Sequence, residues 1–498
     1  MSNGFMYIFL SFYFWIGALW QGYFADMAYL TSNLVLFAGL LVLIGRKREL
    51  VFSRIHLFVF LIIGGYWVSV FYSVDVEQAV LEASRVSGLI PLVLLIGMLP
   101  DDRLQRLYRS WPWIGAALTV AGILLDMERN GRLESTIEYA NALAIFLLVN
   151  IGICLVSYLQ ERRAALMGLM AVNAVGLLLT FSRSVWVLWL AMMIAAVIWF
   201  PELRKRAAWL PVGIVHVCSL ILALLLKGDA FFFWQRVSSI QSKTSEFQIR
   251  LVYWKDSLDM IRDYWLGGTG GGGWNVLVPL YRSQDYFVRY VHNHYVQIAL
   301  DIGIFGLLSF VAWIGVICWL GVKRLRQAKN EARLWGKGSL FLVMVIILHA
   351  GFDFDLTFPF LFAILACLAV QMDVKRFRLR VTKGAFVFAL PATVAVIGFW
   401  GWLAVGYGYK QAADFQANTG RYAKAQKMYQ AAEYMLPWSS NALYGSAKGY
   451  VLQGNATGDG SYYQMAREKL KMAHNKVPEQ TLYTDLLKQL PVNSTKID

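Results

Sequence analysis

Thirteen apolar stretches, each bounded by polar or charged residues, dominate the chain and restrict it to a membrane fold. They lie at 4–20, 27–45, 55–72, 86–100, 111–125, 140–159, 165–181, 185–200, 209–226, 296–320, 339–352, 360–372 and 384–406. Hydrophobic residues make up 58% of the chain, charged residues 15%, and mean hydropathy is +0.51. These values exclude a soluble globule and predict an all-α polytopic membrane protein with about 13 transmembrane helices.

The connecting loops predict the orientation of these helices. Loops after even-numbered stretches hold 23 Lys and Arg residues, whereas the short loops after odd-numbered stretches hold three, namely Arg129, Arg132 and Arg183. Short cytoplasmic loops are enriched in basic residues, so the amino terminus is predicted inside and the carboxyl terminus outside. The net charge of +15 therefore reflects membrane orientation and predicts no nucleic-acid partner. The first stretch lacks a basic n-region and a cleavage site, so we expect it to be retained.

The same alternation divides the chain into four regions. Residues 1–226 contain spans 1–9, residues 227–295 form a large extracytoplasmic loop, residues 296–406 contain spans 10–13, and residues 407–498 form an extracytoplasmic tail. An Ala-x3-large-x2-Ala-x4-Pro pattern within 425–437 of this tail recurs 41 residues later. It predicts a small tetratricopeptide-like helical domain that presents a protein partner or an acceptor.

Two arginines on the predicted outer side are candidate phosphate ligands. Arg183 lies in the tight turn between two spans, where it is either a snorkelling anchor or a bidentate clamp on phosphate oxygens. Arg250 lies in a segment whose apolar residues recur at helical spacing, which predicts an amphipathic surface helix. On such a helix it is either solvated or, together with Arg183, part of a diphosphate site.

Glycines and histidines of the same loop offer further candidates. The run 267–273, including Gly268 and Gly270, lacks the Lys-Ser/Thr of a nucleotide P-loop, so it forms either a close backbone contact with a lipid phosphate or a hairpin turn. One of His292 and His294 is a candidate general base, although a histidine here can also cap a helix.

Beyond this loop, His349 is expected to pair with Asp353, one helical turn on. The Asp353-Phe354-Asp355 sequence imitates a metal-binding motif of transferases that use nucleotide sugars. Those substrates are cytosolic and these aspartates are predicted outside, so we expect neither a metal nor any other cofactor. The four cysteines all lie inside apolar runs and are expected to be core residues.

Several spaced motifs resemble the O-antigen ligase and Wzy-type polymerase superfamily. They are Thr-Phe-Ser-Arg-Ser-Val-Trp around Arg183, Arg250 followed by Trp254 and the Trp265–Gly270 segment, His292-Asn293-x-Tyr295-x-Gln297, and His349-x3-Asp353. The resemblance covers about residues 140–372. Asp301 stands where many relatives carry Glu, and no clear acceptor-binding motif is present.

The resemblance implies a GT-C-like, metal-independent, inverting glycosyltransferase or ligase of the bacterial cytoplasmic membrane, surrounded by membrane lipids. Its donor would be a glycan on undecaprenyl diphosphate, and its acceptor an unidentified glycan, lipid or protein hydroxyl. The arginines of the family correspond to Arg183 and Arg250 and its catalytic histidine to His292, with Gly268, Gly270, Asn293, His294, His349 and Asp353 as supporting candidates.

Two alternatives remain beside ligation of a cell-surface polysaccharide. Polymerisation of repeat units is the same glycosyl transfer to a different acceptor. A flippase or transporter of lipid-linked glycans belongs to another class and predicts charged residues at span midpoints or an inverted repeat.

Overall fold

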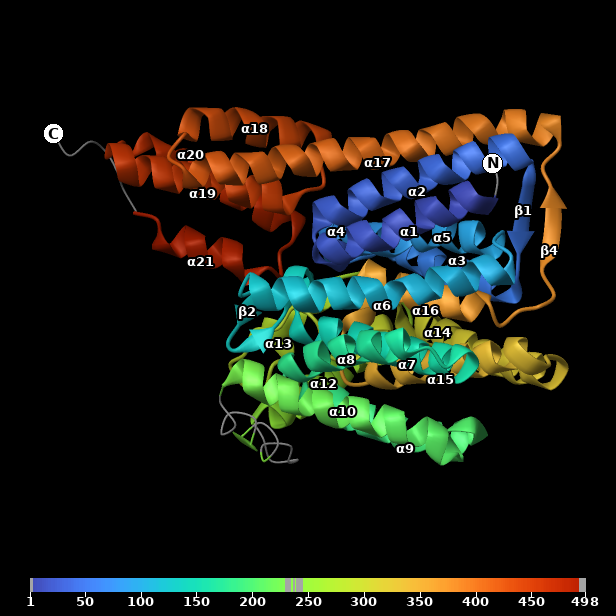
Figure 1. Cartoon of the computed structure of the whole chain (residues 1–498). Coiled ribbons are helices and arrows are strands. Elements are labelled where there is room, and N and C mark those ends of the chain that lie inside the picture. The colour runs from blue at the N-terminus through green and yellow to red at the C-terminus, as the bar shows by residue number, and fades with distance from the viewer. Residues whose placement is uncertain (1–2, 229–233, 236–237, 239–244, 492–498) are drawn as a thin grey trace.

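The computed structural model describes residues 3–228, 234–235, 238 and 245–491, and it is almost entirely helical. Part of the predicted loop 227–295 therefore lies outside the described residues. Long helices run side by side and form a membrane body, with the C-terminal helices at one end (Figure 1). Before the loop the body contains α1 (Asn3–Leu19), α2 (Asp26–Lys47), α3 (Arg54–Ser69), α4 (Val76–Ser87), α5 (Leu89–Gly97), α6 (Asp101–Leu124), α7 (Ala140–Glu161), α8 (Ala164–Leu179), α9 (Arg183–Trp199) and α10 (Arg206–Lys227). The later chain contains α12 (Ser245–Asp263), α13 (Gly273–Tyr281), α14 (His294–Gln327), α15 (Asn330–His349), α16 (Pro359–Val370) and α17 (Lys383–Asn418).

The chain is an all-α polytopic membrane protein, as predicted. Each of the thirteen predicted stretches falls on a helix. Among the described residues, seven helices are long and apolar enough to cross a membrane, namely α2, α4 with α5, α7, α10, α14, α15 and α17. Five further apolar helices are shorter, namely α1, α3, α8, α9 and α16. The number of spans stays a prediction.

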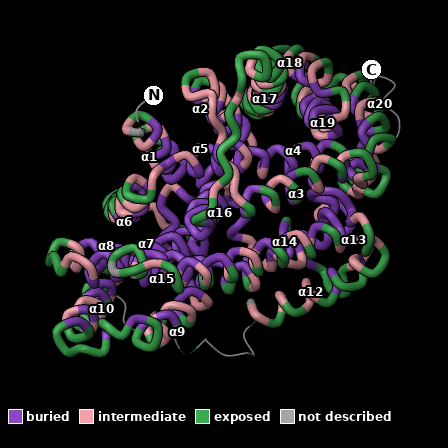
Figure 2. Tube along the Cα trace, turned by 90° about the vertical axis from the view of Figure 1, so that its right-hand side faces the viewer, coloured by how far each residue is buried: buried purple, intermediate pink, exposed green. Residues whose placement is uncertain are grey.

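Burial separates central from peripheral helices. Almost every residue of α7 and α16 is buried at the centre of the body, whereas α9, α10 and α17 expose one side (Figure 2). The exposed side chains of these three helices are mostly apolar, for example Leu190, Ile221 and Phe388. Large exposed apolar surfaces on long helices are what a protein presents to lipid.

Contacts between loops sort them into two ends. Strand β1 (Glu49–Phe52) pairs antiparallel with β4 (Phe377–Arg380), which joins two loops predicted to be cytoplasmic. At the opposite end, the hairpin of β2 (Glu128–Arg129) and β3 (Arg132–Leu133) receives Lys227, whose Nζ lies 2.6 Å from a Glu128 carboxylate oxygen. Short 3₁₀ helices also lie in the loops: Gln21–Tyr23, Ser135–Ile137, Pro201–Arg204 and Asp355–Thr357.

One predicted outer loop is wrong. Residues 73–84 were expected between spans, but α4 begins at Val76 and continues almost directly into α5. Its polar residues are buried and paired: Arg85 Nε donates to Glu82 at 3.0 Å, and the Tyr290 hydroxyl donates to the same carboxylate at 2.8 Å. Charged residues can lie within a membrane helix when they pair with one another. The polar residues of this segment therefore belong to a helix and not to a loop.

Helices α12 and α13 form a small unit beside the N-terminal end of α14. Helix α12 carries Arg250, which confirms the predicted helix there. Buried Met260, Trp274 and Val291 belong to one apolar cluster that joins both helices to the segment before α14. This cluster holds the outer loop against the body and so positions its arginine and histidine.

The C-terminal tail is helical and packs on the body. Helix α17 continues without interruption from the predicted span to Asn418, so no break occurs at residue 407, and α18 (Tyr422–Met435), α19 (Ser440–Thr457), α20 (Ser461–Lys476) and α21 (Thr481–Gln489) follow. Glu77 of α4 accepts hydrogen bonds from the Ser439 hydroxyl and the Asn441 amide, both at 2.8 Å. The tetratricopeptide assignment stays a prediction.

Candidate active site

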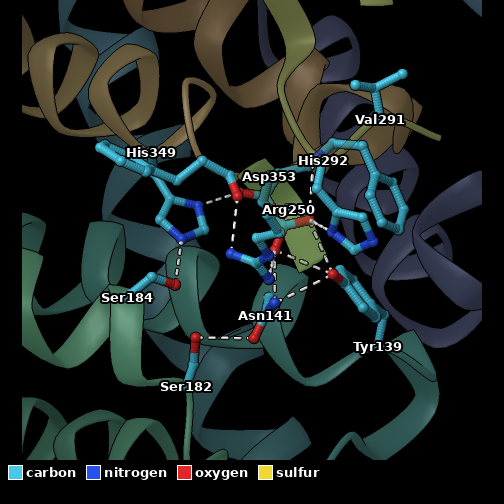
Figure 3. A network of polar contacts seen from close by, with 12 residues as sticks. Tyr139, Asn141, Ser182, Ser184, Arg250, Val291, His292, His349 and Asp353 are labelled. Carbon is cyan, nitrogen blue, oxygen red and sulfur yellow. Dashed lines mark hydrogen bonds and ion pairs between the residues drawn. The ribbon is translucent and has the colours of Figure 1, made fainter. Parts of the chain in front are cut away.

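Four of the predicted site residues belong to one polar network at the end of the body that is predicted to be outside (Figure 3). Arg250 comes from α12, His292 from the segment before α14, His349 from the end of α15, and Asp353 from the turn that follows. Each lies at or close to the end of a helix, so the network joins segments that are distant in sequence.

The carboxylate of Asp353 is the centre of this network. The Tyr139 hydroxyl lies 2.8 and 3.0 Å from its two oxygens, and Asn141 Nδ2 donates to it at 2.5 Å. The Phe354 amide donates at 2.8 Å, and Arg250 Nη2 lies 3.5 Å away. Burial alone would raise the pKa of Asp353, but His292 and Arg250 lower it, and the net pKa is well below its usual range. This carboxylate is therefore ionised at neutral pH.

His292 is oriented by Asp353. Its Nδ1 lies 3.2 Å from Asp353 Oδ1, and because a carboxylate only accepts hydrogen bonds, Nδ1 carries the proton in this pair. Nε2 has no hydrogen-bond partner within the described part of the chain. The Phe354 ring packs edge-on against the imidazole, with 4.9 Å between centroids. A neutral histidine held in this way can accept a proton on Nε2.

Arg250 points its guanidinium at the same turn. Its Nη1 donates to the Phe352 carbonyl at 3.0 Å, and its side chain is partly exposed. The contact with Asp353 is longer than a bidentate pair, so other N–H groups of this fork remain available for an incoming anion.

Arg183 lies next to the network, at the first residue of α9. Its two neighbours belong to the network: the Ser182 hydroxyl donates to Asn141 Oδ1 at 2.9 Å, and the Ser184 hydroxyl lies 3.1 Å from His349 Nε2. Phe181, just before them, has a left-handed backbone with φ 49°. This turn carries Arg183 to the edge of the site.

The predicted pairing of His349 with Asp353 is wrong. His349 Nδ1 instead hydrogen-bonds Asp355. Helix α15 ends at His349, and the chain then turns into the 3₁₀ helix that begins at Asp355. The Asp353 amide still donates to the His349 carbonyl at 3.1 Å, but the turn directs the Asp353 side chain toward His292.

The glycine run lies outside this polar network, and close contacts with the protein backbone and side chains explain why its positions are glycine. Gly268 and Gly270 have φ of 76° and 83°, and a Cβ on Gly268 would lie 2.6 Å from the Leu300 carbonyl oxygen of α14. A Cβ on Gly270 would lie 2.2 Å from the Ser73 Cβ. These contacts with protein account for glycine at both positions without a bound phosphate.

Asn293 and His294 also have structural roles. The Asn293 side chain accepts the Tyr295 and Val296 amides and so caps the start of α14. His294 is buried between the rings of Phe310 and Phe362, and neither ring nitrogen has a partner among the described residues. Its burial places it inside the body.

Sequence reasoning missed Tyr139 and Asn141, which both bond Asp353. They lie at the start of α7, and the sequence Tyr-Ala-Asn there looks like an ordinary helix entrance. Arg132 holds Asn141 in place, with Nη2 donating to Asn141 Oδ1 at 2.6 Å. Polar residues at the entrance of a span were the available signal. Within the described residues, no three His, Cys, Asp or Glu side chains gather in a way that could hold a metal ion.

Comparison with known proteins matches part of the chain to a family. Residues 168–311 match a family model described as O-antigen ligase. This match supports a relationship of the chain to the O-antigen ligase and Wzy-type superfamily. The matched region contains Arg183, Arg250 and His292, whereas Tyr139, Asn141 and Asp353 lie outside it. No curated protein matches the chain.

Proposed function

We propose that this chain transfers a glycan from undecaprenyl diphosphate to an acceptor hydroxyl on the outer face of the cytoplasmic membrane. The observation that carries the proposal is the His292–Asp353 pair beside Arg250, at the end of the body where Arg183 also lies. The family match over residues 168–311 supports a ligase- or polymerase-like membrane enzyme. The diphosphate donor is what the resemblance of the motifs implies.

His292 is proposed as the general base. Nε2 accepts the proton of the acceptor hydroxyl while the hydroxyl oxygen forms a bond to the anomeric carbon. Asp353 stabilises the imidazolium that results, because its carboxylate is ionised and contacts Nδ1. Attack from the face opposite the leaving group inverts the anomeric configuration.

The arginines are proposed to receive the leaving group. The bond from the anomeric carbon to the phosphate oxygen breaks with its electron pair, so negative charge grows on the diphosphate. Guanidinium groups stabilise that charge and offer a fork that matches phosphate oxygens. Both oxygens of Asp353 are already occupied by protein donors, so we propose that the transfer requires no metal.

Ligation and polymerisation differ only in the acceptor. The supporting observations concern the glycan donor and the general base, and they fit ligation and polymerisation equally. We favour ligation because the family model that matches residues 168–311 is described as O-antigen ligase. Transport is less well supported: the buried charged residues Glu77, Glu82, Arg85, Asp301 and Arg324 of the candidate spans all hydrogen-bond to protein groups.

The test is transfer by the purified full-length chain from a synthetic undecaprenyl-diphosphate oligosaccharide to a panel of glycan, lipid and peptide acceptors. His292→Ala should lower turnover by about a hundredfold or more, the usual scale for loss of a general base, while donor binding persists. His474→Ala, in the tail, is the matched control and should keep full activity. Near-normal turnover of His292→Ala would contradict the mechanism.

Further arms of this experiment examine the leaving group and the metal. Arg250→Ala should weaken donor binding and turnover together, and Arg250→Lys should restore only part, because lysine retains the charge without the fork. EDTA should leave the rate unchanged. Rescue of an EDTA-inhibited enzyme by a divalent ion would overturn metal independence, and a product ladder of growing glycans would identify a polymerase.

A further inference from the structure

A basic pocket lies at the end of the body opposite the candidate site. It is an open depression between the start of α3, the end of α14 and the segment after α16. The residues that line it are Arg54, Leu320, Lys323, Arg324, Gln327, Met372, Asp373, Val374 and Lys375. Four of the nine are cations and one is an anion.

The single carboxylate does not neutralise these cations. Asp373 is buried, and its oxygens accept the backbone amides of Arg54 and Lys375 at 3.1 and 3.2 Å. Within the described part of the chain, the side chains of Arg54, Lys323 and Lys375 form no ion pair. The backbone thus satisfies the anion while the cationic groups stay available for another ligand.

Arg324 gives the pocket a fixed wall. Its guanidinium is buried, donates to the Gln371 carbonyl at 2.5 Å, and lies 2.7 Å from an Asp101 carboxylate oxygen. These contacts tie α14 to the segment after α16 and to the start of α6, so the mouth of the pocket is built from anchored elements.

An exposed tryptophan places this pocket at the membrane boundary. Arg54 and Lys323 each lie 5.2 Å from the centroid of the Trp319 ring, which is 53% exposed. Tryptophan is enriched where headgroups meet acyl chains. Leu57, one turn further along α3, and Val322 on α14 are also exposed apolar residues. A cationic pocket with apolar helix surface beside it fits a ligand with an anionic head and hydrocarbon tails.

We infer that this pocket binds the phosphate headgroup of an anionic phospholipid, with the acyl chains lying along α3 and α14. The basic loops of this end predict that it faces the cytoplasm, where the leaflet is negatively charged. A soluble phosphate would satisfy the cations but would leave the apolar surface without a role. The inference does not depend on the proposed transfer function.

Native mass spectrometry of the detergent-purified full-length chain tests the lipid site. Dioleoyl phosphatidylglycerol should form a saturable adduct, whereas dioleoyl phosphatidylcholine should bind far more weakly. In the double variant Arg54→Ala/Lys323→Ala, affinity for phosphatidylglycerol should fall on the order of tenfold or more, since each cation near an anionic lipid surface contributes measurably. The variant Arg380→Ala/Lys383→Ala removes the same charge from exposed positions at the same end and should bind normally.

Three results would overturn the inference: equal binding of the two lipids, unchanged affinity in Arg54→Ala/Lys323→Ala, or displacement of the lipid by inorganic phosphate at comparable concentration, which would identify a soluble anion. If the alanine pair fails to fold by size-exclusion chromatography, Arg54→Gln/Lys323→Gln retains the bulk and carries the same expectation.

Discussion

At the scale of single residues, the candidate site depends on one buried carboxylate. Asp353 receives donors from α7, α12 and the segment before α14, and so fixes how these elements meet. His292 and Phe181 on either side of the site both have left-handed backbones, with φ of 53° and 49°. Such conformations cost on the order of 1–3 kcal/mol each and gather at functional sites, which agrees with the role proposed for this region.

Asp353→Asn should reduce turnover by about a hundredfold or more. The amide keeps the size of the carboxylate but loses the charge that stabilises a protonated His292, and it presents a donor where His292 already donates. Donor affinity should change less than turnover. Single-turnover kinetics with the synthetic donor separate these two quantities, and equal loss in both would assign Asp353 to donor binding instead.

The same variant has a distinct pH signature. Because the pKa of folded Asp353 is depressed below its ordinary value of 3.8, its stabilising contribution is present above that value and is lost as pH falls through the lower, folded pKa. The difference in melting temperature between wild type and Asp353→Asn should therefore not shrink between pH 7 and pH 5 and should shrink only in stronger acid. A difference that already shrinks between pH 7 and pH 5 would contradict the ionised state.

Site residues could be predicted from the sequence where their residue type is rare in a membrane protein. Arg250 and His292 stand out in a chain with little charge, and the structure brings both to Asp353. Tyr139 and Asn141 did not stand out, because tyrosine and asparagine are common at helix entrances. Their partner Asp353 lies more than two hundred residues away in sequence, and a single sequence contains no record of that contact.

At the scale of elements, apolar periodicity located the helices but not their breaks. Helix α14 is interrupted at Ile302 and Gly303, where the backbone leaves helical angles. The glycine run packs its main chain into this break: the Thr269 amide donates to the Leu300 carbonyl at 2.7 Å, and the Ile304 amide to the Trp265 carbonyl at 2.9 Å. The sequence alone allowed either a phosphate contact or a turn for these glycines. Backbone packing between distant segments leaves no recognisable pattern in a sequence, so it was not predicted.

Gly303→Ala should destabilise the protein strongly. Gly303 has φ 66°, and a Cβ there would lie 2.1 Å from the Leu266 carbonyl oxygen, so either the helix break or the glycine run must move. The cost should be on the order of 3 kcal/mol, seen as a melting temperature lowered by several degrees in detergent.

Gly315→Ala is the matched control on the same helix. A Cβ at Gly315 would meet nothing within 4 Å, and alanine favours helix by about 1 kcal/mol over glycine. This variant should melt at or above the wild-type temperature. Equal effects of the two substitutions would mean that the close approach at Gly303 does not support the fold.

At the scale of the whole molecule, contacts between loops agree with the parity of the basic residues. Loops predicted inside meet one another through β1–β4 and through Arg376, which lies near Asp101. Loops predicted outside meet at the candidate site and where the Thr136 hydroxyl donates to the Ala18 carbonyl at 2.7 Å. The tail adjoins the end of the body that carries the candidate site, since Val276 of α13 shares an apolar cluster with Leu443 and Leu470 of the tail. Counts of basic residues predict the same two groups of loops, because each helix that crosses the body takes the chain from one end of it to the other.

Cysteine labelling in intact cells tests the topology. Ser283→Cys in the outer loop and Ser461→Cys in the tail should react with an impermeant thiol reagent, because both positions are exposed and lie at the end of the body that carries the site. Arg333→Cys and Lys383→Cys are equally exposed but belong to the opposite, basic end, so they should react only after the membrane is opened. The native cysteines lie within membrane helices, and Cys154 and Cys367 are buried, so the unsubstituted chain should give little background.

Protection of Ser283→Cys and Ser461→Cys together with labelling of the other two would reverse the orientation. The proposed site would then face the cytoplasm, and a proposed function on the outer face would fall with it.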